Sequence, residues 1–441
     1  MAMGEARTKE SARQIAMVCL DELVPEDDRY RRIDALVGDW GFVREAARSY
    51  YREGIGRPSI DPTVLLKLML AGALEGIGSM RELLRVADLR LDLRLFLGYG
   101  LGERLPAHQT ISDAQTQRFA DGEVFERLFL RTVALCTEQG LIEGSHLSVD
   151  GFHVEANAAL RSLRASLEPL PGDTAGDPGT DDAPAPAAPQ LRLAEPRSGP
   201  TPKRRASNQT AVSTTDPDAR LKGKPGQRPH LVYRGHVAVD PKARCIVSCL
   251  GERAEGYEGD GLAPILDRAR FCVPKLASVG ADQGYAAERV WEDAAERDLV
   301  AYIPPQKTML PKGRTPRTNA QRLALEAKER AKSEAGLWAH RRRMADAEGA
   351  IAELKTLHAL DRVRCRGTPA FHVQLLVGSA AVNLKRLAKH TPAAHEGVAT
   401  APATLAAASN RRSGQPRHDH QQTTIRIGAQ QIVCTVNLCL N

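Results

Sequence analysis

The sequence predicts an α/β protein in which an all-helical segment precedes a sheet flanked by helices. From Val24 to about Gly144, apolar residues recur at helical spacing and are broken by glycine turns. From His146 onward, short apolar runs alternate with amphipathic stretches, as in strands that alternate with helices. A hydrophobic content of 42% in 441 residues is enough for at least one substantial core.

The helical segment contains start and stop signals for several helices. Residues 57–63 (Arg-Pro-Ser-Ile-Asp-Pro-Thr) supply cap and first-turn residues, and Gly76-Ile-Gly78 breaks the chain before Ser79. Helices are expected at 64–70, 79–84 and 124–135, and residues 106–112 are expected to form a turn into another helix. A helix, glycine turn, helix pair of this kind could be a helix-turn-helix reader of DNA, although such pairs more often only pack.

The second part of the chain predicts a sheet with a hairpin-connected edge. Strands are expected at 147–154, 233–239, 246–250, 276–281 and 299–303, with helices at 262–271 and 286–297. Three successive strands come first, and strands alternating with helices follow. Ligands of such sheets gather at the carboxyl ends of strands, which is where Asp282 falls.

Two segments lose this periodicity and set the expected domain boundaries. Residues 160–228 fill with Pro, Gly, Ala, Asp and Thr, which predicts a disordered insertion between the first two strands. Residues 391–441 are predicted to be a low-complexity tail. The remaining organisation is an N-terminal extension at 1–23, a helical domain at 24–144 and a sheet domain at 145–390.

Composition excludes a membrane span and points to a polyanionic partner. No run of about 18 apolar residues and no secretory leader are present, so we expect a soluble, cytoplasmic protein with no membrane partner. The net charge of +7 is concentrated in residues 303–366, which hold fifteen Lys or Arg against seven Asp or Glu. A basic segment of this kind suits nucleic acid, although a solvated helix face is the alternative.

Two aspartates occur where apolar strands would exclude them, and a glutamate follows on the basic segment. Asp150 interrupts one expected strand, Asp282 ends another, and Glu348 lies on the later helix. Aspartate is depleted from strands, and a buried carboxylate without a partner costs on the order of several kcal/mol. A compensating divalent cation is therefore expected, and hard oxygen ligands select Mg²⁺ or Mn²⁺.

Three carboxylates can hold two such ions if one of them bridges both. Asp150 on the first strand is the natural bridge, and Asp282 and Glu348 would each complete the shell of one ion. This arrangement predicts phosphodiester chemistry, whereas each acidic residue alone would more often be a surface charge. Glu348 and Lys355 are seven residues apart and share a helical face, so the lysine could contact DNA. The candidate DNA-binding residues are Lys355, Arg341, Arg342, Arg343, Arg364 and Arg366.

The chain resembles the DDE transposases of bacterial insertion sequences. The motifs that carry the resemblance are 147–157 (Leu-Ser-Val-Asp-Gly-Phe-His-Val-Glu-Ala-Asn), 233–240, 281–285 (Ala-Asp-Gln-Gly-Tyr), 348–355, 364–367 and 383–386, with 56–62, 96–98 and 108–112 in the helical segment. By position, Asp150, Asp282 and Glu348 match the metal-binding triad, and Lys355 matches the signature lysine. The chain departs from the family at Arg341 and Met344, where tyrosine and arginine are the pattern.

The resemblance implies a ribonuclease H-like mixed sheet flanked by helices, preceded by a helical domain that binds the element's ends. It implies two Mg²⁺ ions, replaceable by Mn²⁺, and a nucleoid-associated homo-oligomer on paired ends. The expected activity is nicking at terminal inverted repeats and joining of the freed 3′-hydroxyl to target DNA. A decayed or repurposed DNA-binding relative, and a nuclease of the same fold without strand transfer, remain open alternatives.

Overall fold

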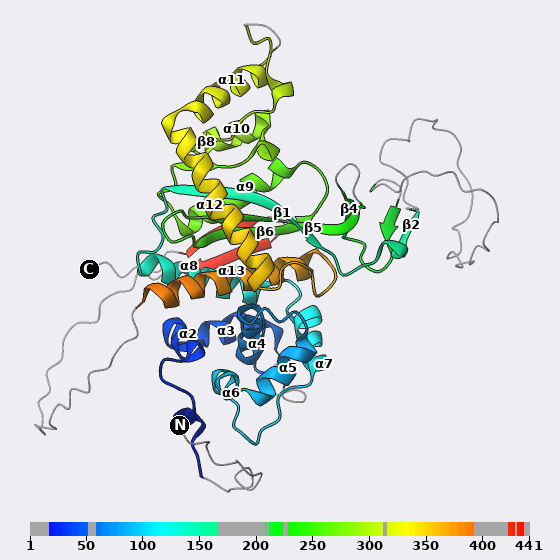
Figure 1. Cartoon of the computed structure of the whole chain (residues 1–441), viewed down its shortest axis with the longest axis vertical. Helices are drawn as coiled ribbons and strands as arrows, with labels where there is room; N and C mark the ends of the chain where they lie inside the picture. The colour runs from blue at the N-terminus through cyan, green and yellow to red at the C-terminus, as the bar shows by residue number, and fades with distance from the viewer. Residues whose placement is uncertain are drawn as a thin grey trace, which may run out of the picture. The chain divides into compact units, whose positions relative to one another are not determined.

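The computed structural model describes residues 17–51, 59–165, 208, 211–223, 228–311, 315–391, 422–427 and 430–435 (Figure 1). The chain divides into two compact units, 1–393 and 394–441. The described residues of the second unit form an antiparallel hairpin of β9 (Gln422–Ile427) and β10 (Gln430–Thr435). The C-terminal tail predicted from low complexity therefore contains two strands, and its other residues from 392 onward, like residues 1–16, lie outside the described ones.

The first unit begins with a bundle of helices, which we call the helical module. Its helices are α1 (Leu20–Leu23), α2 (Arg29–Val37), α3 (Gly41–Ala47), α4 (Pro62–Leu74), α5 (Met80–Leu89), α6 (Leu91–Leu97), α7 (His108–Asp113) and α8 (Glu123–Glu138). The predicted start signals are confirmed: Asp61 caps α4, with Pro62 in the first turn, and Ser79 caps α5. Gly98 ends α6 in the left-handed conformation at φ +77°. Nearly every residue of α4 from Leu65 to Leu74 is buried, so this helix is the core of the module.

A mixed sheet follows the helical module. Its strands are β1 (His146–Glu155), β4 (Arg220–Lys222), β5 (His230–Val239), β6 (Ile246–Arg253), β7 (Ser278–Gly280) and β8 (Val300–Tyr302). The order is β4-β5-β1-β7-β8, and β6 also pairs with β5. β1 is antiparallel to β5 and parallel to β7, and β7 is parallel to β8. This arrangement confirms the predicted ribonuclease H-like mixed sheet with a hairpin-connected edge.

The insertion predicted at 160–228 is structured at both of its ends. β2 (Leu163–Ala165) pairs with β3 (Ala211–Ser213), and β4 extends the main sheet. Side chains anchor this region, since Asp216 accepts a hydrogen bond from the Tyr233 hydroxyl and Asp218 accepts one from the Thr368 backbone. Composition alone could not show these contacts, which join segments far apart in the chain. Residues 166–207 of the expected insertion lie outside the described residues.

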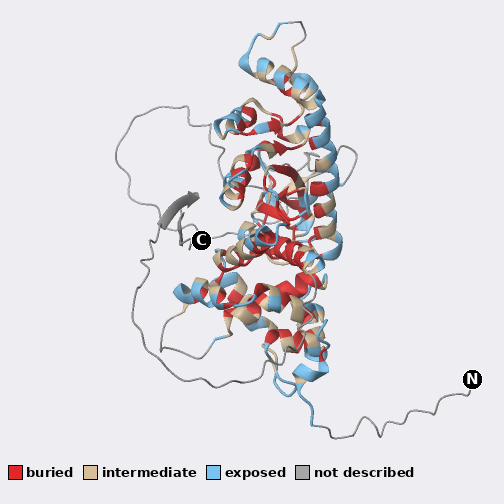
Figure 2. Cartoon of the chain, turned by 90° about the vertical axis from the view of Figure 1, so that its left-hand side faces the viewer, coloured by how far each residue is buried: buried red, intermediate tan, exposed pale blue. Residues whose placement is uncertain are grey.

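Helices cover both faces of the sheet and connect it to the helical module. They are α9 (Leu262–Cys272), α10 (Glu288–Glu296), α11 (Asn319–Lys332), α12 (Glu334–Leu357) and α13 (Thr368–His390). The long helix α12 crosses β1 and β5, while α13 packs between β6 and helices α4 and α8 (Figures 1 and 2). Residues on most sides of α13 are buried as a result. No helix among the described residues has the length and apolarity that a membrane span needs.

Candidate active site

The register of two parallel strands places the two predicted aspartates side by side. Ser148 of β1 pairs with Gly280 of β7, and each aspartate lies two residues beyond this pair. Asp150 is still within β1, whereas Asp282 follows β7 and accepts a hydrogen bond from the Gly284 backbone at 2.8 Å. Both residues therefore lie at the carboxyl edge of the two strands, where such sheets bind their ligands.

Helix α12 brings the third carboxylate to the same edge. Asp150 and Phe152 share one face of β1, because side chains alternate along a strand. Two residues of α12 contact this face: Arg343 pairs with Asp150, and the Lys355 Nζ atom lies 5.4 Å from the centre of the Phe152 ring. Glu348 lies between these two residues along the helix, which places it beside Asp150.

One guanidinium joins two of the three carboxylates. Arg343 Nη1 donates to Asp150 Oδ2 at 2.8 Å, and its Nη2 lies 3.0 Å from Glu348 Oε1. Asp150 and Arg343 are each only 8% exposed, while the Glu348 side chain is 50% exposed. Arg343 therefore supplies a positive charge at the point where the sequence argument required one.

That single positive charge does not neutralise the site. Burial raises the pKa of Asp150 to about 6, although Arg343 lowers it, and the negative charges of Asp282 and Glu348 raise it further. The three carboxylates thus interact with one another through space. A carboxyl group with this pKa is only partly protonated at neutral pH, and a nearby cation would complete its ionisation.

The chemistry of the donor set fits a hard divalent cation, because all three side chains offer carboxylate oxygens. In the part of the chain that the structure describes, no three His, Cys, Asp or Glu side chains are arranged to hold an ion. Arg343 lies between Asp150 and Glu348, so a cation shared by these two carboxylates would take the place of the guanidinium. The donors are therefore present, with an arginine bridging two of them.

Sequence reasoning missed a fourth carboxylate at this edge, Glu258. A Cβ atom built on Gly284 would lie 2.8 Å from Glu258 Oε2 and 2.9 Å from Asp282 Oδ1, so the two carboxylates approach each other at this glycine. Burial raises the pKa of Glu258, and the charge of Asp282 raises it further. Glu258 begins the short helix 258–261 in a glycine-rich turn, and no periodic pattern marked it.

The three consecutive arginines of α12 have three different environments. Arg341 is exposed, whereas Arg342 Nε lies 2.9 Å from Asp346 Oδ2 and the same guanidinium donates to the Pro241 carbonyl. Arg343 is buried in the site described above. Only the first of the three is therefore free to meet a ligand from solvent.

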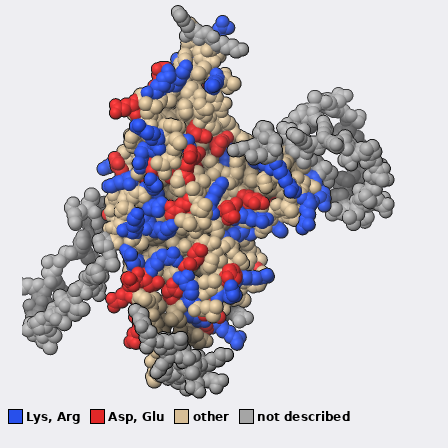
Figure 3. Space-filling model, in the orientation of Figure 1, with Lys and Arg blue, Asp and Glu red and all other residues tan. Residues whose placement is uncertain are grey.

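The remaining predicted DNA-binding residues lie at two other places. Lys355 is half-buried over Phe152, while Arg366 is exposed and Arg364 lines a separate pocket. On the face seen in Figure 3, Lys and Arg gather over α11 and α12 with acidic groups among them. The basic segment thus forms a mixed surface beside the carboxylates.

In comparisons with known proteins, two family models match the chain, one in its N-terminal part and one in its C-terminal part. Residues 18–117 match the family model described as Transposase domain (DUF772), and residues 306–388 match the model described as Transposase DDE domain. The second match includes Glu348 and Lys355, whereas Asp150 and Asp282 lie between the two matched ranges. No curated protein and no solved structure matches the chain.

Proposed function

We propose that this chain, which carries the N-terminal transposase domain and the C-terminal DDE domain of insertion-sequence transposases, cuts DNA at an element's ends and joins it to target DNA. The observation that carries the proposal is the strand register that sets Asp150 beside Asp282, with Glu348 added by α12. The mutual charge effects on Asp150 support a shared site.

Asp150, Asp282 and Glu348 would hold divalent metal, with Mg²⁺ as the expected ion and Mn²⁺ as its substitute. Two such ions supply an activated water or 3′-hydroxyl and stabilise the leaving oxygen of an in-line displacement. Asp150 is mounted on a central, buried strand, so its position is fixed before DNA arrives. If metal took the place of the guanidinium at Asp150, Arg343 would still supply a positive charge near the reacting phosphate.

The DNA partners would be the terminal inverted repeats and the target. Arg341, Arg366 and Lys355 would contact the phosphate backbone, since they lie on or after the helix that carries Glu348. The helical module, predicted at 24–144, would bind the element's ends. A homo-oligomer on paired ends and a cytoplasmic, nucleoid-associated location belong to the same proposal.

A second candidate is a relative that binds DNA without cutting it. Its support is Arg343, which takes the position between Asp150 and Glu348 that a shared cation would need. A nuclease of the same fold without strand transfer is separated from the preferred function by a joining assay with a labelled 3′-end.

The test is nicking of a labelled terminal inverted repeat by the purified full chain with Mg²⁺. Asp150→Asn is expected to lower the nicking rate by about a thousandfold, which corresponds to about 4 kcal/mol of lost transition-state stabilisation. Glu329→Gln is the matched control, since Glu329 is exposed on α11 and pairs only with Lys332. Equal nicking rates for Asp150→Asn and wild type would show that Asp150 is not a residue of the active site.

A further inference from the structure

We propose that a cavity between the helical module and α13, the Arg364 pocket, binds a phosphate of the DNA backbone. The cavity has a volume of about 290 Å³ and is lined by residues of α4, α5 and α7 on one side and of 358–377 on the other. That the phosphate belongs to DNA rests on the function proposed above. The pocket itself follows from the contacts around Arg364.

Arg364 brings a positive charge into the pocket without a protein partner. Among the described residues, none forms an ion pair with Arg364, and its Nε atom is buried with no hydrogen-bond acceptor. Burial lowers the pKa of the guanidinium, although electrostatic interactions with Cys365 and Asp361 oppose this effect. Because a buried cation is costly unless paired, an anion from outside would complete this site.

The backbone of Arg364 is fixed on both sides, so the charge is presented from a rigid position. Its N–H donates to Gln374 Oε1 and its carbonyl accepts from Asn157 Nδ2, each at 2.9 Å. Gln374 Nε2 in turn donates to the carbonyls of Ala359 and Arg362, both at 3.0 Å. A buried glutamine of α13 and a residue after β1 therefore hold the loop that carries the guanidinium.

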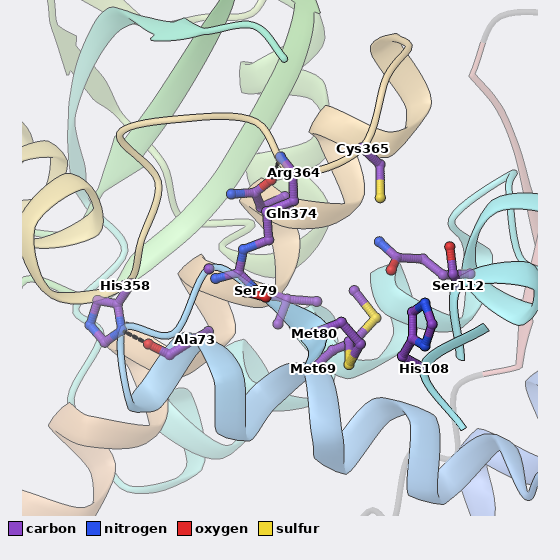
Figure 4. Close-up of a pocket in the computed structure, with 13 residues that line it drawn as sticks. Met69, Ala73, Ser79, Met80, His108, Ser112, His358, Arg364, Cys365 and Gln374 are labelled. Atoms are coloured by element: carbon purple, nitrogen blue, oxygen red, sulfur yellow. Dashed lines mark hydrogen bonds between the residues drawn. The ribbon is translucent and has the colours of Figure 1, made fainter. Parts of the chain in front are cut away.

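The opposite wall offers hydrogen-bond donors and no negative charge. Figure 4 shows Arg364 and Gln374 on one side of the pocket and His108 and Ser112 on the other. In the described structure, the His108 ring and the hydroxyl of Ser112 have no hydrogen-bond partner, nor has the side-chain amide of Gln115. No Asp or Glu lines the cavity. A cation surrounded by neutral donors is the chemistry that recognises a phosphate group.

The position of the pocket favours DNA over free inorganic phosphate. One wall belongs to the helical module, which would bind the element's ends, and the other follows α12, which carries Glu348. A phosphodiester held here would fix a bound duplex relative to the carboxylate site. Contacts to the backbone of this kind set register and orientation without reading sequence.

The first arm of the test uses inorganic phosphate and thermal unfolding of the full chain. Phosphate is expected to raise the Tm of wild type above its value in chloride of equal ionic strength. Arg364→Met keeps a long side chain but removes the charge, so its Tm in chloride should equal or exceed that of wild type, with no phosphate response. A phosphate-dependent rise in Tm that persists in Arg364→Met would contradict phosphate binding at Arg364.

The second arm measures duplex DNA affinity against salt concentration. Arg364→Met should weaken binding about tenfold, as expected for loss of one charged hydrogen bond, and reduce the slope of log K against log salt by about 0.9. Arg362→Gln is the control, because this exposed arginine lies two residues away on the same loop. Equal losses in both variants would indicate a general charge effect and contradict the pocket.

The two arms also separate this inference from the proposed function. Phosphate stabilisation that depends on Arg364 with unchanged DNA affinity would assign the pocket to free phosphate and overturn its role in DNA binding. Loss of DNA affinity in Arg364→Met confirms the pocket whether or not the protein nicks DNA. Failure of nicking in wild type would instead count against the proposed function alone.

Discussion

Two glutamates five residues apart on α12 have opposite electrostatic surroundings. Glu353 is mostly buried, with Lys385 Nζ at 2.7 Å, His358 Nε2 at 3.6 Å and the Arg386 guanidinium in contact. Burial alone would raise its pKa, but the contacts with His358, Lys385 and Arg386 hold it well below the usual range. Glu348 is half exposed and has one arginine, which it shares with Asp150.

Under the proposed function, the difference separates a carboxylate that joins two helices from one that would bind metal, both on the same helix. The cations around Glu353, Lys385 and Arg386, come from α13, so this cluster holds the two helices together. At Glu348, one guanidinium serves two carboxylates while Asp282 adds a further negative charge. The Glu353 carboxylate is already supplied with cations, whereas the carboxylates at the edge of the sheet share a single guanidinium.

Glu353→Gln is expected to have the largest effect on stability. Removal of the carboxylate leaves the partly buried cations of α13 uncompensated, which costs about 2–3 kcal/mol. Urea unfolding measures this loss, with Glu329→Gln as an exposed control. A change below about 1 kcal/mol would show that the cluster does not hold α12 to α13.

The contributions of Asp150 and Glu353 to the pH dependence of stability should have opposite signs. The pKa of Asp150 is raised in the folded state, so its contribution is present below about pH 4 and is lost as the pH rises through about 6. Asp150→Asn should therefore gain about 2 kcal/mol relative to wild type between pH 4 and pH 7. Urea unfolding in EDTA at several pH values tests this, and a constant difference would contradict it.

Glu353 serves as the opposite case in the same experiment. Its pKa is depressed by folding, so its contribution is present above about pH 4.3, the ordinary value, and is lost as the pH falls through the folded value. The stability difference between wild type and Glu353→Gln should accordingly disappear in acid. Both variants would then approach wild type in acid, Asp150→Asn from higher stability and Glu353→Gln from lower stability.

Glu348→Gln should change stability least. Its side chain is half exposed, and exposed ion pairs contribute about 1 kcal/mol or less. The same variant should abolish nicking, because a carboxylate of the cutting site is removed. A loss of stability as large as that of Glu353→Gln would contradict the claim that only Glu353 of the two stabilises the packing of the helices.

The strands and their acidic residues could be predicted because they leave a local signal. Asp150 and Asp282 each break an apolar run, and parallel pairing of β1 with β7 then sets them side by side. The mixed sheet followed from the order of strands and helices. Strand β4 was missed because it is only three residues long and is held by contacts with distant segments.

The environments of the arginines could not be predicted from the sequence. Arg341, Arg342 and Arg343 are identical neighbours, and only the rotation of α12 about its axis decides which of them meets Asp150. Likewise, the guanidinium of Arg364 has no partner among the described residues, and α4, α5 and α7 line the pocket that it faces. Such outcomes depend on packing between segments that are remote in the chain.

The most direct test of the central claim is calorimetric titration of the full chain with Mn²⁺. Wild type and Glu353→Gln, measured where both are folded, are expected to bind the ion with similar affinity. Asp150→Asn should bind Mn²⁺ at least about tenfold more weakly, because one carboxylate ligand of the ion is lost. Unchanged Mn²⁺ affinity in Asp150→Asn, or a loss confined to Glu353→Gln, would contradict a metal site at the edge of the sheet.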